Sequence, residues 1–257
     1  MNELFDTIYV INLESNVDRL KSFDSMMKKF NWNYQRHSAI DGKKITENLN
    51  RLKEKYIRKF SLLSPGEIGC LLSHVLLWEE VANNPSKKRI LIFEDDARTY
   101  AEGKTIENIL LNFYNYLKSY NILEPEMLYL GKALDDCLNY EKVWENIYKT
   151  KHPLCLHAYI INKHGAQKLL KLTPYNVPID LVPIRAIKDK IINVMTFHPS
   201  LFYQDVFNNV SNLRSFKHAI SNTVECSSCH YISEEVWIIL ISVFIVLVCT
   251  ILLFIFI

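Results

Sequence analysis

The chain has 257 residues, 49% of them hydrophobic and 23% charged, so it can bury a core of ordinary globular size. Lys+Arg 30 against Asp+Glu 28 leaves a formal net charge of +2, which excludes bulk electrostatic attraction to nucleic acid as a basis for function. The chain holds only 6 glycines, and so few argue against a loop-rich all-β fold.

The first part of the chain alternates strand-like and helix-like stretches. Thr7–Leu13 is apolar and β-rich, which is typical of a buried strand. Apolar residues at helical spacing from Leu20 to Phe30 predict an amphipathic helix, and a second strand is expected at Tyr34–Ile40 before the turn signal Asp41-Gly42. Strand, helix and strand in this order open a βαβ unit, and they predict an α/β fold.

A long helix is expected to begin at Pro65, after a charged helical stretch at Asn48–Phe60. Ser64 precedes the proline and Glu67 follows three positions after the serine, which is the pattern of a capping box with proline at the first helical position. His74 falls on this mostly apolar helix. From the sequence alone, a histidine there is more often a hydrogen-bonded core residue than a ligand.

The most informative stretch is Arg89–Asp96, which reads Arg-Ile-Leu-Ile-Phe-Glu-Asp-Asp. Its apolar centre predicts a short strand buried on both faces. Side chains alternate along an extended chain, so we expect Glu94 and Asp96 to point to one side and Asp95 to the other. Two carboxylates at the carboxyl end of a buried strand suit a hard cation such as Mn²⁺ or Mg²⁺. The alternative is a solvated acidic turn.

Two later segments have a pattern of their own. Apolar residues at helical spacing predict a helix at Ile106–Tyr120, and Ile191–Phe197 is strand-like. Between them, Asp135 and Asp136 come shortly after the apolar residues around Leu128. Contact with a ligand and a plain turn are both compatible with that position.

The last part of the chain has a different composition. Val236–Ile257 contains no charged residue, and about 20 such residues are enough for a helix to cross a bilayer. A buried core helix is the alternative. The polar residues 208–235 are expected to form a linker. No signal-peptide pattern stands at the N-terminus, so we expect a single-pass tail anchor with residues 1–207 on the cytosolic side.

Several of these motifs together resemble glycosyltransferase family 25, which includes lipooligosaccharide glycosyltransferases and collagen galactosyltransferases. The most specific part is Gly66-Glu-Ile-Gly-Cys70 with Ser73-His74 and Trp78, followed by the strand that ends in Glu-Asp-Asp. The resemblance spans about residues 7–205, and its weaker pieces are Val10–Leu13 with Arg19, Ala39–Gly42, Leu128–Gly131, Ala158–Ile161, Pro178–Asp180 and Pro199–Gln204.

The resemblance implies an enzyme with a GT-A-like fold, a mixed α/β sheet flanked by helices that binds a nucleotide-diphospho-sugar. Residues 1–207 then form the catalytic domain, a hexosyltransferase of lipopolysaccharide or other glycan synthesis. It implies transfer of a sugar such as galactose from a nucleotide sugar, expected to be a UDP-sugar, to a glycan, lipid-linked or protein acceptor. Mn²⁺ or Mg²⁺ would neutralise the diphosphate leaving group.

The same resemblance assigns roles to individual residues. It implies metal ligands at Asp96, Glu94 and His198, a catalytic base at Asp180, and donor-binding residues at Asn12, Arg19, Asp41, Glu67, Ser73, His74, Glu94 and Asp95. Collagen-type members have a glutamate after the aspartate that matches Asp180, whereas this chain has Leu181, so the identity of the base stays open. The competing interpretation is a catalytically inactive, membrane-anchored adaptor that keeps the fold.

Overall fold

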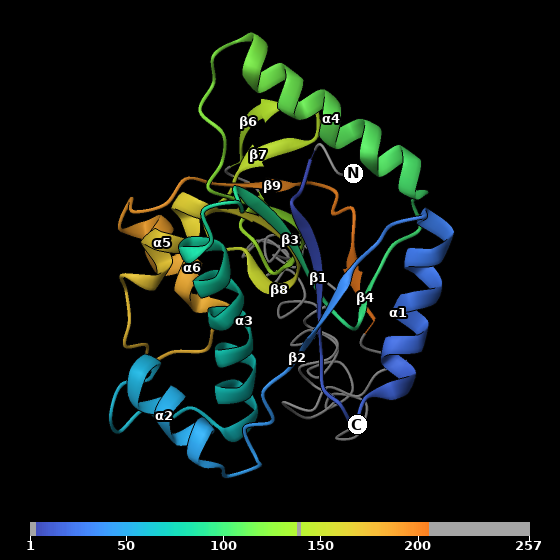
Figure 1. Ribbon diagram of the computed structural model, residues 1–257. Coiled ribbons are helices and arrows are strands. Elements are labelled where there is room, and N and C mark those ends of the chain that lie inside the picture. The colour runs from blue at the N-terminus through green and yellow to red at the C-terminus, as the bar shows by residue number, and fades with distance from the viewer. Residues whose placement is uncertain (1–3, 138–139, 206–257) are drawn as a thin grey trace, which may run out of the picture.

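The computed structural model describes residues 4–137 and 140–205, and within them the chain forms a mixed sheet with helices on both faces (Figure 1). The 8-stranded sheet has the order β2-β1-β3-β8-β5-β9-β7-β6. Its strands are β1 (Thr7–Asn12), β2 (Gln35–Ser38), β3 (Arg89–Glu94), β5 (Met127–Ala133), β6 (Glu141–Trp144), β7 (Ile147–Lys149), β8 (Leu154–Asn162) and β9 (Val194–Phe197). A second, 2-stranded sheet pairs β4 (Ala97–Arg98) with β10 (Tyr203–Gln204).

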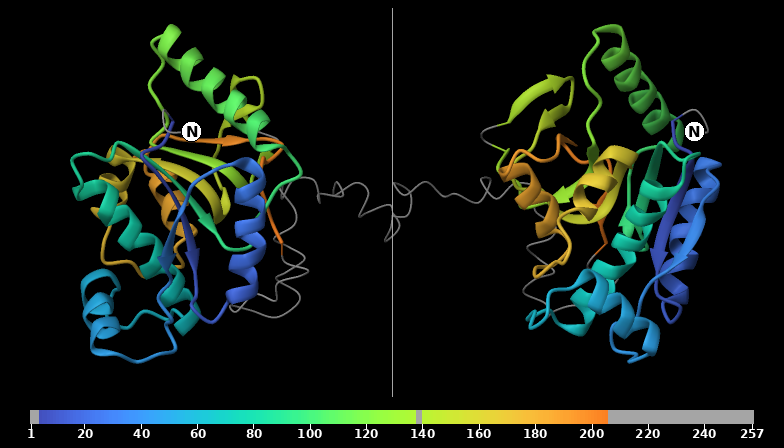
Figure 2. Two further views of the ribbon diagram at one scale, coloured as in Figure 1. Left: turned by 45° about the vertical axis from the view of Figure 1, so that its right-hand side comes forward. Right: turned by 60° about the vertical axis from the view of Figure 1, so that its left-hand side comes forward.

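The helices cover the main sheet in two layers (Figures 1 and 2). One core lies between the sheet and the helices α1 (Val17–Phe30) and α4 (Gly103–Ser119). The other lies against α3 (Pro65–Asn83), α5 (Lys163–Leu170) and α6 (Leu181–Lys188), with α2 (Glu47–Tyr56) beside α3. Burial of apolar side chains on both faces of the sheet is the main stabilising contribution to such a fold.

Two sequence features account for the elements nearest the site. Ile90, Leu91, Ile92 and Phe93 of β3 are all 0% exposed, as expected for a strand covered on both faces. At the start of α3, the backbone N–H of Glu67 donates to Ser64 Oγ, and Ser64 N–H donates to Glu67 Oε2 at 2.9 Å. The capping box satisfies donors that the first helical turn would otherwise leave unpaired.

The strand order creates a crevice between β1 and β3. The chain passes from β1 to β2 on one side and then returns across β1 to β3 on its other side, and all three strands run parallel. The connecting helices α1 and α3 therefore lie on opposite faces of the sheet. Where strand order reverses in this way, the loops at the carboxyl ends of the two central strands diverge and leave room for a ligand.

The expected α/β class is confirmed, including the βαβ opening β1–α1–β2. The helix expected at Asn48–Phe60 is shorter, because α2 ends at Tyr56. Sequence periodicity did not reveal α6 or the short strands β4, β6, β7 and β10, since a few residues are too short to establish a period. Among the described residues no helix is both long and apolar enough to cross a membrane. The expected linker at 208–235 and membrane helix at Val236–Ile257 lie outside the described residues and stay predictions.

Candidate active site

A pocket of about 210 Å³ opens at the carboxyl ends of β1 and β3. Chain segments far apart in the sequence form its wall: the end of β1 and the loop after it up to Arg19, the loop Ala39–Lys43 after β2, and the first turns of α3. Glu94, Asp95 and Asp96 form its acidic side, and Gln204 of β10 also lines it. The pocket thus lies at the crevice that the strand order creates.

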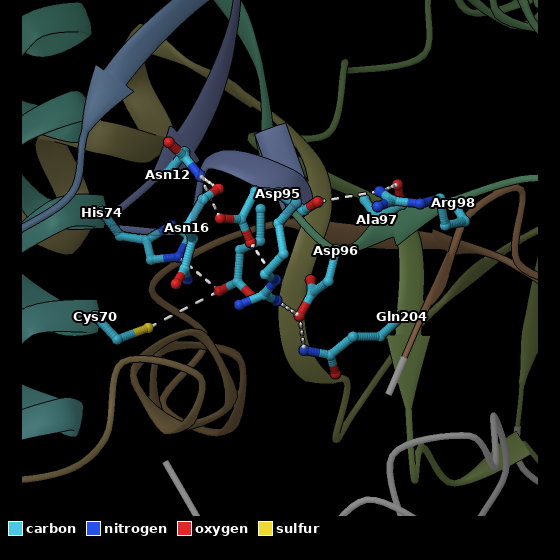
Figure 3. Close-up of polar contacts among 11 residues, drawn as sticks. Asn12, Asn16, Cys70, His74, Asp95, Asp96, Ala97, Arg98 and Gln204 are labelled. Carbon is cyan, nitrogen blue, oxygen red and sulfur yellow. Dashed lines mark hydrogen bonds and ion pairs between the residues drawn. The ribbon is translucent and has the colours of Figure 1, made fainter. Parts of the chain in front are cut away.

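Asp95 is held by two neighbours (Figure 3). Asn12 Nδ2 donates to Asp95 Oδ2 at 2.6 Å, and Arg19 Nε lies 3.0 Å from Asp95 Oδ1. Asn12 is itself oriented by Arg36, whose Nε donates to Asn12 Oδ1 at 2.9 Å. With both carboxylate oxygens engaged and only 4% of the residue exposed, Asp95 joins the end of β1 to the acidic turn.

The expected opposite orientation of Asp95 and Asp96 is wrong. Arg19 contacts both carboxylates, and both residues line the same pocket. The strand β3 ends at Glu94, and Asp95-Asp96 forms a turn. Side-chain alternation applies only to extended backbone, so it does not continue past the end of the strand.

Asp96 has one engaged oxygen and one without a partner. Its Oδ2 accepts hydrogen bonds from Arg19 Nη2 and from Gln204 Nε2, the latter at 3.2 Å. Among the described residues nothing contacts the buried Oδ1 by a hydrogen bond. Burial, and next the charge of Glu94, raise the pKa of Asp96 to about 7 despite the opposing effect of Arg19. An unpartnered carboxylate oxygen beside a second carboxylate fits a hard divalent cation.

Glu94 is approached from α3. Its Oε1 lies 3.1 Å from His74 Nε2 and 3.8 Å from Cys70 Sγ. Burial by itself would raise the pKa of Glu94, but the hydrogen bond and charge of His74 outweigh it, and the pKa is lowered. His74 is 0% exposed, so it is placed to support Glu94 and does not line the pocket.

Of the other expected donor-binding residues, Asp41 and Ser73 line the pocket and Glu67 does not. Ser73 Oγ donates to Gly69 O at 2.7 Å and accepts from Ile40 N at 2.9 Å, which ties α3 to the loop after β2. Asp41 Oδ1 accepts from Lys43 N at 3.0 Å within the turn. Glu67 closes the capping box of α3.

Close packing of α3 on the loop after β2 requires glycine. A Cβ at Gly69 would lie 2.3 Å from Ile40 O, and one at Gly42 would lie 1.8 Å from Pro65 O. Both glycines line the pocket. In the sequence they are only small residues near a turn and near a helix start. Their close contacts, Gly69 with the loop after β2 and Gly42 with the start of α3, are visible only in the tertiary structure.

Asp180 immediately precedes α6 and is half-buried. Its side chain makes no capping hydrogen bond to that helix. Burial, and next the negative charge of Glu94, raise its pKa. Asp180 is therefore electrostatically coupled to the acidic end of β3, and Leu181 is the first residue of the helix.

The structure does not bring His198 to the acidic turn. His198 follows β9, which β8 and β5 separate from β3, a distance of roughly 14 Å across the sheet at ordinary strand spacing. Its ring packs edge-on against Tyr140 and Tyr148, with centroids 5.5 Å and 6.2 Å away. The resemblance, together with a position after a late strand, was the basis for expecting a metal ligand at His198, and the strand order places it away from the acidic turn.

Asp135, a candidate for ligand contact, is also structural. It is 0% exposed, and its carboxylate accepts hydrogen bonds from Tyr140, Thr150 and the backbone of His152. The carboxylate thus holds together the segment between β5 and β8. A buried carboxylate with this many donors has little capacity left for a ligand.

Comparison with known proteins assigns the chain. The sequence profile of glycosyltransferase family 25 (LPS biosynthesis protein) matches residues 5–183, a range that contains the acidic turn, α3 and Asp180. The chain belongs to glycosyltransferase family 25. Gln204, which lines the pocket, falls outside the matched family 25 range.

Curated relatives include two that are named as members of the same family. The chain is 26% identical to procollagen galactosyltransferase 2 of Homo sapiens over 209 residues, 76% of this chain and 33% of that protein. It is 25% identical to a glycosyltransferase 25 family member of Drosophila pseudoobscura pseudoobscura over 190 residues, 68% of this chain and 29% of that protein. It is 27% identical to a probable inactive glycosyltransferase 25 family member 3 of Bos taurus over 188 residues, 68% and 31% of the two chains.

The chain thus spans about a third of the length of these curated relatives. A solved glycosyltransferase involved in glycosylation of the major capsid of PBCV-1 is 8% identical, with a TM-score of 0.40, over 79% of this chain and 94% of that chain. That likeness is too weak to support an argument about fold or activity.

Proposed function

We propose that the protein is a metal-dependent glycosyltransferase that transfers a hexose such as galactose from a nucleotide sugar to a glycan, lipid-linked or protein acceptor. Membership of family 25 supports the reaction class. The observation that carries the proposal for this chain is the buried, unpartnered Oδ1 of Asp96, beside Glu94 in a pocket at the strand crossover. That arrangement is what a GT-A-like site for a cation and a diphosphate needs.

The proposed cation is Mn²⁺ or Mg²⁺, held by Asp96 together with Glu94, which lines the same pocket. When bound, it would neutralise charge on the diphosphate leaving group of the donor, for which a UDP-sugar is the first candidate. Arg19 and Gln204 both hold the carboxylate of Asp96. Both contacts use Oδ2, so Oδ1 faces neither of them.

Asp180 is the proposed base. An inverting transfer needs one carboxylate to take the proton from the acceptor hydroxyl. Burial and Glu94 raise the pKa of Asp180, which strengthens it as a proton acceptor. Asp135, the next candidate by sequence, is engaged by four donors and is less suited to the role.

The test is donor hydrolysis and transfer by the full purified chain. A panel of nucleotide sugars is incubated with Mn²⁺, and release of the nucleoside diphosphate is measured with and without chelator. Chelator-sensitive release from one donor is expected. Binding of a nucleotide sugar without any release, with or without acceptors, would instead support the inactive adaptor. Leu181 and the name of the bovine relative are the observations that favour that alternative.

Membrane attachment through Val236–Ile257 is a separate proposal, which rests on the absence of charged residues there. With residues 1–207 on the cytosolic side, the sequon Asn209-Val-Ser211 should stay unmodified in cells. Recovery of the full chain in the membrane fraction, without a glycan on Asn209, is the expected result. A glycan on Asn209 would place the domain in the lumen.

A further inference from the structure

Four side chains form a continuous buried chain of contacts from α3 through β8 to the pocket. Trp78 Nε1 donates to Tyr159 Oη at 2.9 Å. Tyr159 Oη lies 2.9 Å from His74 Nδ1, and His74 Nε2 lies 3.1 Å from Glu94 Oε1. Trp78, Tyr159 and His74 are each 0% exposed, so they depend on one another for hydrogen bonds.

The chemistry of Trp78 and Glu94, the two end groups, determines which group donates in each of these hydrogen bonds. Indole N–H can only donate, so Tyr159 Oη accepts from Trp78 and has its own proton to give. At the other end, Glu94 Oε1 is the oxygen that Cys70 Sγ also approaches as a donor, at 3.8 Å, and a carboxylate oxygen placed between two such groups acts as the acceptor. Every group is satisfied in one arrangement: Tyr159 O–H donates to His74 Nδ1, and His74 Nε2–H donates to Glu94. Any other placement of the protons on Tyr159 and His74 leaves a buried donor or acceptor unpaired.

We propose that His74 is a positioning residue, held between Tyr159 and Glu94 as the tautomer protonated on Nε2, and that it orients Glu94 in the pocket. His74 occupies Oε1 of Glu94, while Oε2 makes no hydrogen bond within the described part of the chain. The side chain of Glu94 is 23% exposed and lines the pocket. His74 therefore fixes which oxygen of Glu94 is presented, and this consequence, unlike the tautomer, rests on the proposed donor site.

The assignment also excludes a competing use of the same atoms. The ligand atoms of Cys70, His74 and Glu94 lie within 4.8 Å of one another, close enough to share a soft cation such as Zn²⁺. Such a cation would need the lone pair of His74 Nε2. That nitrogen carries the proton in the arrangement that satisfies every hydrogen bond. Zinc binding and the proposed tautomer are thus alternatives.

The chain offers a matched control. Tyr129 of β5 lies directly opposite Tyr159 of β8 in the sheet, with ring centroids 6.4 Å apart. Its Oη is buried and has no hydrogen-bond partner among the described residues. Tyr129→Phe therefore removes a buried hydroxyl from the same layer without touching the chain of contacts.

The test is ¹⁵N NMR of histidine-labelled full chain, with the His74 signals assigned by their loss in His74→Gln. We expect a protonated Nε2 and an unprotonated, hydrogen-bonded Nδ1 in the unaltered chain and in Tyr129→Phe. In Tyr159→Phe the donor to Nδ1 is lost, so Nδ1 should give the signal of an unprotonated nitrogen without a hydrogen bond, while Nε2 stays protonated against Glu94. An unprotonated Nε2 in the unaltered chain, or Zn²⁺ binding that Cys70→Ser abolishes, would overturn the proposal.

The positioning role of His74 is tested separately, by measuring the affinity for UDP in the presence of Mn²⁺. Tyr159→Phe and His74→Leu should weaken it by about tenfold or more, the usual effect of losing an orienting partner of a metal-site residue. His74→Gln should restore most of it, because its amide can donate to Glu94 from a similar position. Equal affinity for His74→Leu and His74→Gln would assign His74 a packing role only. The NMR result stands even if the chain transfers no sugar.

Discussion

Gln204 Nε2 donates a hydrogen bond to Asp96 Oδ2 at 3.2 Å and so joins two residues 108 positions apart. The pairing of β10 with β4 holds this contact, since Gln204 stands opposite Ala97, the residue after Asp96. Asp205 N–H adds a hydrogen bond to the backbone oxygen of Asp96 at 2.9 Å. The acidic turn is therefore braced by the end of the described chain as well as by Arg19.

Asp96→Ala should abolish the binding of Mn²⁺ and the Mn²⁺-dependent binding of UDP, because it removes the unpartnered Oδ1. The fold should survive, as Asp96 lies in a turn after β3 and adds little apolar contact. Glu94→Ala should weaken binding less. Calorimetric titration of Mn²⁺ and UDP measures both. Asp18→Asn, an exposed carboxylate next to Arg19, is the control and should bind normally. Small, equal effects from Asp96→Ala and Glu94→Ala would mean that the metal site lies elsewhere or is absent.

Without metal, stability should fall as pH rises through the range set by Asp96. Burial, and then Glu94, raise the pKa of Asp96 to about 7 from a model-compound value of 3.8. The folded chain therefore binds this proton more tightly than the unfolded chain. Its contribution is fully present below the unfolded pKa and is lost as pH rises through about 7.

Urea unfolding at several pH values measures the difference in stability between the unaltered chain and Asp96→Asn, which isolates this carboxyl group. As pH rises, the free energy of unfolding of the unaltered chain should fall relative to that of Asp96→Asn. Added Mn²⁺ should stabilise the unaltered chain only and so reverse that trend. A difference that is constant with pH would show that the pKa of Asp96 is not raised.

Arg19→Lys should weaken UDP binding, because lysine cannot take over the contacts of Arg19. The guanidinium contacts Asp95 through Nε and Asp96 through Nη2, and the compact ammonium of lysine cannot repeat that two-pronged contact. Arg19→Ala leaves two buried carboxylates without their cation, and we expect a loss on the order of 3 kcal/mol in the free energy of unfolding. Arg51→Ala, on the exposed face of α2, should change stability by less than about 0.5 kcal/mol. Wild-type UDP binding by Arg19→Lys would contradict this role.

Asp180→Asn should leave donor binding intact while sugar transfer falls by about 10² or more. The amide keeps the shape of the side chain and removes its ability to accept a proton. For the unaltered chain, transfer should increase with pH through the raised pKa of Asp180, because the base acts when deprotonated. Steady-state rates with saturating donor measure both effects. Near-normal transfer by Asp180→Asn would give Asp180 another role.

Gly69→Ala should destabilise the chain by about 1 to 3 kcal/mol, because the added Cβ would lie 2.3 Å from the backbone oxygen of Ile40. Relief of that clash moves α3 or the loop after β2, so the affinity for UDP should fall as well. Asn83→Ala, exposed at the end of the same helix, is the control for an alanine in α3. Unfolding and UDP titration of the two variants give the comparison.

Local sequence determined the elements whose signals are local. The apolar run before Glu94 specified a strand buried on both faces, since only such a strand has no polar side. Ser64, Pro65 and Glu67 specified the start of α3, because capping depends on neighbours within one turn. Spacing of apolar residues specified α1 and α4 in the same way. The motif around Gly66–His74 and the acidic strand end also identified the family.

Only the tertiary structure decided which of the expected site residues meet. Strand order kept His198 away from the acidic turn, and the end of β3 at Glu94 turned Asp95 toward Arg19. Contacts across long sequence separations, such as Gln204 with Asp96 and Tyr159 with His74, left no local pattern to detect. A periodicity reports which face of its own element is buried; it does not report what lies against that face, because that depends on how the elements are ordered in the sheet.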